Sequence, residues 1–174
     1  MRRSNSWLAL LGFGAAVVGA GWMGSHFGPR DLRTRLWYGR LKKPAYNPPN
    51  AAFPIAWSIL YGLMAVSGWR TWRARDSAER TRALALWAAQ LGVNAAWAPL
   101  FFGRHRPKQA LADVIVLEAI ILAYMATAKE VDGTAAACFV PYGAWVAFAT
   151  LLNAEIVVRN PNAERMLPGP APFY

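Results

Sequence analysis

The sequence predicts an all-α membrane protein, a bundle of five transmembrane helices, and three observations support this. Hydrophobic residues make up 56% of the 174 residues and charged residues only 16%, whereas about a quarter of a soluble domain is charged. The apolar runs are about 20 residues long, and a helix of that length crosses the ~30 Å hydrocarbon core of a bilayer. The basic residues, 19 Lys and Arg against 9 Asp and Glu, fall mostly between these runs. The predicted helices cover about 6–27, 51–72, 83–103, 108–128 and 134–158.

This placement of charge excludes a nucleic-acid-binding protein, which needs a basic stripe on a soluble fold. The basic residues lie instead where lipid headgroups would meet the ends of the helices. We therefore expect one membrane domain over residues 1–160, in contact with lipid, followed by a loose Pro-rich tail over 161–174. The sequence leaves open whether the membrane is an inner or an outer one.

The first span has two interpretations. Arg2 and Arg3 before an apolar stretch resemble a cleavable signal peptide. We favour a membrane helix, because the apolar run continues past Ala20 through Met23 and reaches the length of a span. Small residues also recur at every fourth position, a pattern typical of close helix contact, and these are Gly12, Ala16, Ala20 and Gly24.

The connection over residues 28–50 is the longest between spans and is rich in aromatics and prolines. It contains Trp37 and Tyr46, and two lysines precede its prolines. Such a segment is either an interfacial belt, in which Trp and Tyr lie at headgroup level, or an ordered lid over the bundle. From the residues alone we favour the belt.

Within the membrane, aromatic and amide residues share one face of three predicted helices. Indole and amide groups need hydrogen-bond partners in lipid, so these faces should turn toward the interior of the bundle. There they form either a pocket for a flat apolar molecule or polar contacts that join the helices. The residues concerned are Trp57 and Tyr61 in the second span, Gln90, Asn94 and Trp97 in the third, and Tyr142, Trp145, Ala149 and Asn153 in the fifth.

Two acids lie deep in the fourth span, and intramembrane acids are costly and often functional. Asp113 is close to the start of the span, so we expect it to pair with Lys108 or Arg104. Glu118 lies about 140° further around the helix and has no evident partner.

The sequence shows no catalytic motif, no phosphate-binding loop and no metal-ligand spacing. The two histidines are far apart in the chain, and the single cysteine excludes an intramolecular disulfide. We therefore expect neither a resident cofactor nor a metal.

Several stretches together resemble the translocator protein family, also known as TspO, the peripheral benzodiazepine receptor or tryptophan-rich sensory protein. The resemblance implies a five-helix bundle, usually a homodimer, that binds porphyrins such as protoporphyrin IX or haem, sterols and benzodiazepine-type drugs. The matching stretches, in order, are WYGRLKKPAYNPP, FPIAWSILY, AQLGVNAAWAPLFFG, ALADVIVL and PYGAWVAFATLLN.

By this resemblance, the site has a wall and a lid. The lid residues are Trp37 and Tyr46, the second of which stands where the family often has Trp. The segment that recognises sterols in the family needs a central Tyr, which this chain lacks, so the resemblance does not extend to cholesterol. The implied ligand-binding residues are Trp57, Asn94, Trp97, Tyr142, Trp145 and Ala149.

The sequence therefore predicts a membrane receptor or transporter that binds porphyrins and related flat apolar ligands and regulates tetrapyrrole metabolism or a stress response. The alternative implied by the family is an enzyme that degrades porphyrin in light. In that case Trp57 and Trp145 would be its catalytic residues.

Overall fold

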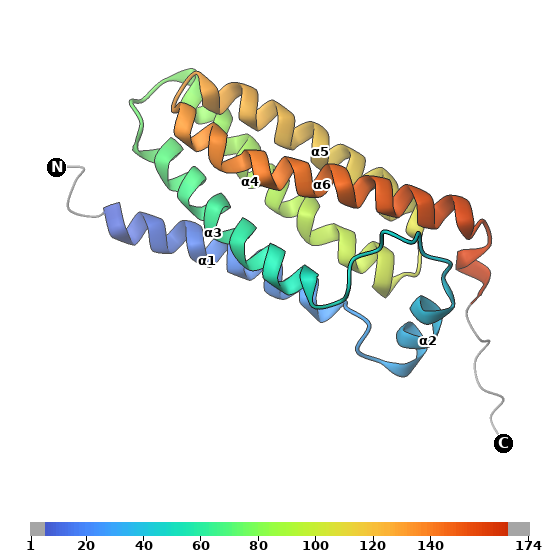
Figure 1. Cartoon of the computed structure of the whole chain (residues 1–174). Helices are drawn as coiled ribbons and strands as arrows, with labels where there is room; N and C mark the ends of the chain where they lie inside the picture. The colour runs from blue at the N-terminus through green and yellow to red at the C-terminus, as the bar shows by residue number, and fades with distance from the viewer. Residues whose placement is uncertain (1–5, 167–174) are drawn as a thin grey trace.

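The computed structural model describes residues 6–166, and all regular structure in that range is helical (Figure 1). Five helices are long and apolar enough to cross a membrane, so the predicted all-α bundle of five membrane helices is confirmed. The long helices are α1 (Ser6–His26), α3 (Ala52–Arg73), α4 (Ala78–Ala98), α5 (Pro107–Lys129) and α6 (Gly133–Arg159), and the shorter ones are α2 (Leu32–Arg40), the π-helix η1 (Pro99–Gly103) and the 3-10 helix η2 (Ala163–Arg165).

Polar caps fix where the helices begin. The carboxylates of Asp31 and Asp132 accept hydrogen bonds from free backbone amides in the first turns of α2 and α6, those of Thr34 and Ala135, both over 2.9 Å. Ser77 does the same for α4 with its hydroxyl, and Pro107 begins α5, where its missing N–H costs nothing. The hydrogen bond from the Thr34 amide lowers the pKa of Asp31.

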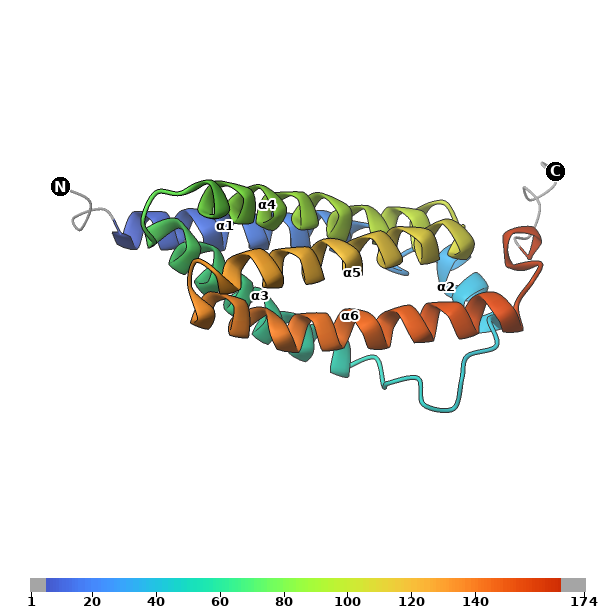
Figure 2. The ribbon, with the colours of Figure 1, turned by 90° about the horizontal axis from the view of Figure 1, so that it is seen from above.

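The long helices close into a ring, in which α1 packs against α3 and α4, α3 against α6, and α5 against both α4 and α6 (Figures 1 and 2). The interior of the ring is therefore shared by helices that are far apart in the sequence. Because each helix has a neighbour on two sides, apolar and aromatic side chains can turn inward as well as toward lipid.

The helix α1 is an integral wall of this ring, as a membrane helix should be. Its Phe13 ring meets the Trp87 ring edge-on at 4.8 Å, and the Trp69 indole donates to the Ser6 carbonyl over 2.8 Å. Both rings crowd Gly68, where a Cβ would lie 2.6 Å from Trp87 and 2.7 Å from Phe13. The small residues Gly12 and Ala16 are exposed on the outer face of α1.

A buried polar cluster joins three helices at the end of the bundle away from α2. The Ser67 hydroxyl donates to the Ala135 carbonyl over 2.7 Å and lies 2.7 Å from the Tyr124 hydroxyl. Thr71 lies 2.9 Å from the same hydroxyl. These bonds connect α3, α5 and α6 in a region without water, where unpaired hydroxyls would be costly.

The connection 28–50 differs from the interfacial belt that we favoured. It contains the helix α2, and Trp37 on that helix is 0% exposed, so the belt interpretation is wrong for Trp37. The Trp37 indole donates to the Ala163 carbonyl over 2.9 Å. Asn160 exchanges two hydrogen bonds with the backbone of Lys42, at 2.9 and 3.0 Å. The connection is thus folded onto the C-terminal end of α6 and onto η2.

The expected loose tail begins differently as well. Its first residues form η2, which is held by Trp37 and has Ala163 buried. Residues from 167 onward lie outside the described part of the chain.

Candidate functional site

The polar centre of the bundle is the hydroxyl of Tyr142, which α6 carries into the interior. Asn94 donates to it over 3.0 Å, and the hydroxyl in turn donates to the side-chain oxygen Oε1 of Gln90 over 3.0 Å. Gln90 also donates to the Trp87 carbonyl over 3.0 Å and is fully buried. Gln90 therefore joins helices, whereas half-buried Asn94 has an amide oxygen to which no described residue donates.

The α3 wall of the site consists of aromatic rings beside Tyr142. The half-buried Trp57 ring lies 6.1 Å from the Tyr142 ring and 5.2 Å from that of Tyr61. Tyr61 lies against the backbone of α1, where any Cβ at Gly21 would overlap its ring. Glycine at this position lets α1 approach closely enough to support the wall.

The α6 wall continues from Tyr142 toward the lid through Trp145. The Trp145 ring is half-buried and lies 5.9 Å from both Phe53 and Phe148. Phe148 in turn meets the ring of Tyr46 at 6.2 Å. The lid residue Tyr46 is therefore linked to Trp145 through one intervening ring, and half-buried Ala149 follows one turn later on α6.

The third side of the site belongs to α4 and η1. Trp97 stacks on Phe101, with ring centroids 4.9 Å apart and planes 18° apart. Phe101 also meets the lid residue Trp37 at 5.5 Å. Phe101 lies in the π-helix η1, where the Arg104 amide donates to the Pro99 carbonyl over 2.8 Å. This bond spans one residue more than an α-helical bond does and so widens the turn that carries Phe101.

The predicted residues thus fall into three connected groups. Trp57 and Asn94 each contact Tyr142, Trp145 reaches Tyr46 through Phe148, and Trp97 reaches Trp37 through Phe101. Ala149 borders the second group only by its place on α6.

The two intramembrane acids of α5, Asp113 and Glu118, are both half-buried. Each has one buried carboxyl oxygen without a hydrogen bond among the described residues. The predicted pairing of Asp113 with Lys108 or Arg104 is wrong, since no ion pair joins them. Glu118 lies over α6 at Gly143, where a Cβ would be 3.9 Å from its oxygen.

The lid carries its own charged contacts. Lys43 donates to the Tyr38 carbonyl over 2.6 Å and lies 4.1 Å from the centre of the Tyr38 ring. Burial lowers the pKa of Lys43 and raises that of Tyr38. The described residues contain no cluster of three or more metal-ligating side chains, so the site offers aromatic rings and a few hydrogen-bonding groups.

Sequence reasoning missed the role of His105, because a lone histidine at a span end carries no pattern. Its backbone has a positive φ of 54°. This turn brings the buried ring to 4.6 Å from Trp37 and its Nε2 to 3.2 Å from the Thr34 hydroxyl. His105 therefore fastens α2 to the end of the bundle.

Comparison with known proteins identifies the relatives of this chain. Residues 13–159 match the model of the TspO/MBR family. The chain is 41% identical over 131 residues to a tryptophan-rich sensory protein of Cereibacter sphaeroides, covering 75% of this chain and 81% of that protein. It is 38% identical over 147 residues to protein CrtK of Rhodobacter capsulatus, covering 84% and 89%.

A more distant relative has the same extent. The human translocator protein is 32% identical over 150 residues, which cover 84% of this chain and 87% of that protein. The match of the family model begins within α1 and ends with α6, so it takes in all five membrane helices and the lid. This chain is a multi-pass integral membrane protein and belongs to the TspO/MBR family.

Proposed function

We propose that this protein is a membrane receptor or transporter that binds porphyrins, such as protoporphyrin IX or haem, and related flat apolar ligands between α3, α4 and α6. The observation that carries the proposal is the set of half-buried rings around one polar centre, with Trp57 and Trp145 on two walls. Aromatic walls favour a planar conjugated guest, and a few polar groups orient it.

The polar centre supports the same ligand class. The amide oxygen of Asn94, to which no described residue donates, can accept a hydrogen bond from a donor group at the edge of a ligand, such as a protonated carboxyl group. The lid adds Tyr46, half exposed at 50% and linked to Trp145 through Phe148, so its side chain can move without breaking a described hydrogen bond. Relatives carry the names translocator protein and tryptophan-rich sensory protein, and those names fit movement or sensing of a ligand.

The test is a titration of the detergent-solubilised protein with protoporphyrin IX in the dark, followed by quenching of tryptophan fluorescence. We expect saturable quenching in the native protein. Trp145→Leu should weaken the affinity roughly two- to tenfold, because an aromatic pair is worth about 0.5–1.5 kcal/mol beyond its buried area.

The matched control is Trp7→Leu, which removes an indole that is exposed on α1. It should lower the total fluorescence and leave the affinity unchanged. Equal affinities for the native protein, Trp145→Leu and a Trp57→Leu/Trp145→Leu double variant would refute the proposed site.

Repeating the titration under illumination separates binding from degradation. If the protein is a receptor or transporter, the absorption spectrum of illuminated porphyrin should be the same with the protein as without it. A protein-dependent new absorption band that disappears in the double variant would instead favour the porphyrin-degrading enzyme.

A further inference from the structure

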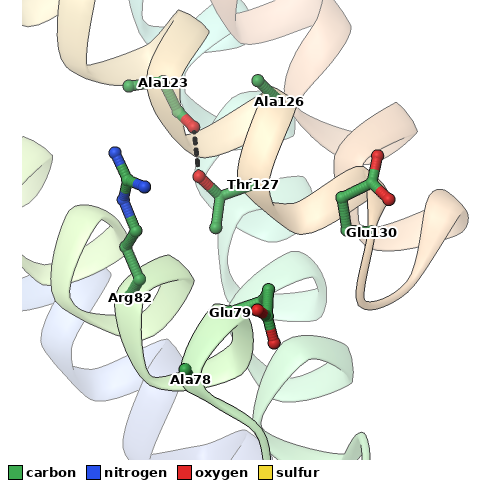
Figure 3. Close-up of a pocket in the computed structure, with 7 residues that line it drawn as sticks. All are labelled: Ala78, Glu79, Arg82, Ala123, Ala126, Thr127 and Glu130. Atoms are coloured by element: carbon green, nitrogen blue, oxygen red, sulfur yellow. Dashed lines mark hydrogen bonds between the residues drawn. The ribbon is translucent and has the colours of Figure 1, made fainter.

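A second candidate site lies at the opposite end of the bundle from α2, in a groove between the first turns of α4 and the last turns of α5 (Figures 1 and 3). The groove has a volume of about 470 Å³. Its lining residues are Ala78, Glu79, Arg82, Ala123, Ala126, Thr127 and Glu130.

Short side chains create the hollow. Three of the lining residues are alanines, so neither helix fills the space between them. Thr127 turns its hydroxyl back onto its own helix and donates to the Ala123 carbonyl over 2.9 Å (Figure 3). The floor of the groove is therefore mostly apolar, and its one hydroxyl, that of Thr127, already has a hydrogen-bond partner.

Both signs of charge line the groove, and they are separated. Figure 3 shows the Arg82 guanidinium at one side and the carboxylates of Glu79 and Glu130 at the other. None of these three forms an ion pair with a described residue. Neighbouring arginines on this end of the bundle do, since Arg70 pairs with Asp132 at 3.0 Å.

The groove lies where a lipid headgroup would be. The helix α4 begins at Ala78 and α5 ends at Lys129, so the groove is at one membrane surface. One face of α5 leads from it toward the membrane centre, because Ala126, Leu122 and Ile115 follow at helical spacing and are exposed. Acyl chains can lie along that face.

We propose that this groove binds a phospholipid with a primary ammonium headgroup, phosphatidylethanolamine. Its phosphate pairs with Arg82, its ammonium donates to Glu79 and Glu130, and its acyl chains follow the exposed face of α5. An ammonium offers three N–H donors to the carboxylates. A trimethylated choline offers none, and the glycerol headgroup of phosphatidylglycerol has neutral hydroxyls in place of the positive charge that the two acids attract.

The experiment measures lipid retention by native mass spectrometry on delipidated protein supplied with dioleoyl phosphatidylethanolamine, phosphatidylcholine or phosphatidylglycerol at equal concentration. We expect the ethanolamine lipid to be retained preferentially. The double variant Glu79→Gln/Glu130→Gln should reduce its retention about tenfold, the loss expected for one charge-assisted hydrogen bond. Arg82→Gln should reduce it to a similar extent.

Two exposed charged residues outside the groove provide matched controls. Arg75→Gln removes the same charge as Arg82→Gln, and Glu164→Gln removes one carboxylate, both without touching the lining, and retention should stay at the native level. Retention of the choline or glycerol lipid as strongly as the ethanolamine lipid would overturn the proposal. So would unchanged retention in the double variant, which would indicate a phosphate contact alone.

Discussion

At the scale of single residues, Tyr142 has the greatest number of roles. Its ring borders Trp57 in the candidate site, and its hydroxyl connects Asn94 with Gln90. Asn94 and Gln90 both lie on α4, so the Tyr142 hydroxyl joins α4 to α6. These two helices flank α5 and are not consecutive in the chain. Within a membrane no water is present to replace this hydrogen bond, so its loss leaves the polar groups unsatisfied.

Tyr142→Phe tests this role. The change leaves the buried oxygen of Gln90 without a donor, and an unsatisfied buried group costs about 1–3 kcal/mol. We expect a lower temperature of unfolding in detergent, followed by tryptophan fluorescence. Tyr46→Phe, which removes an exposed hydroxyl, should leave the unfolding temperature unchanged, and equal effects of the two changes would contradict the role of the network.

At the scale of elements, α2 is held by a buried histidine. His105 is buried against Trp37 and bonded to Thr34. Burial lowers the pKa of His105, the nearby Arg33 lowers it further, and Asp31 opposes this weakly. A histidine in this environment is held in its neutral form, which packs against the indole without carrying a charge into the interior.

The docking of α2 should therefore weaken in acid. The undocked histidine takes up a proton near its ordinary pKa of about 6.5, whereas the docked one resists until a lower pH. The contribution of His105 is then fully present above about pH 6.5 and is lost as the pH falls from there toward the docked pKa. Unfolding temperatures measured between pH 8 and pH 5 should decline less in His105→Gln than in the native protein.

The second histidine serves as the control for this prediction. His26 is exposed at the end of α1, and His26→Gln should keep the native dependence on pH. An equally steep decline in His105→Gln would show that other groups are responsible.

At the scale of the whole molecule, the ring of helices depends on close approach at one point. The α1 ring of Phe13 and the α4 ring of Trp87 both lie against Gly68 of α3. Trp87 is held there by its hydrogen bond to the Met64 carbonyl at 2.9 Å. Three helices thus meet where one side chain is missing.

Gly68→Ala should push α1 and α4 away from α3. The new Cβ would stand 2.6 Å from the Trp87 ring and 2.7 Å from the Phe13 ring, and overpacking of this kind costs about 1–3 kcal/mol. We expect a lower unfolding temperature and a changed near-ultraviolet circular dichroism of tryptophan.

The control is Gly62→Ala on the same helix, where a Cβ would have no atom within 4 Å. It should be neutral or stabilise the helix by up to about 1 kcal/mol. A native unfolding temperature in Gly68→Ala would mean that the three helices can separate at no cost.

The sequence by itself determined the class of the protein and its membrane helices. Apolar runs of the length of a bilayer leave a chain no other way to satisfy its backbone than to form helices, and the aromatic stripes show which faces carry Trp57, Asn94 and Trp145. Charge between the runs follows from the cost of burying it in lipid. These properties are local, so a single span reveals them.

Only the tertiary structure decided which of the aromatic and amide faces of α3, α4 and α6 contact one another. The closed ring places α6 beside both α3 and α5, and this brings Tyr142 to Asn94 and Trp57. It also decided that Trp37 is buried rather than interfacial, because its partners Ala163 and His105 come from distant parts of the chain. Contacts between distant segments depend on how helices pack, and no periodicity within one segment encodes them.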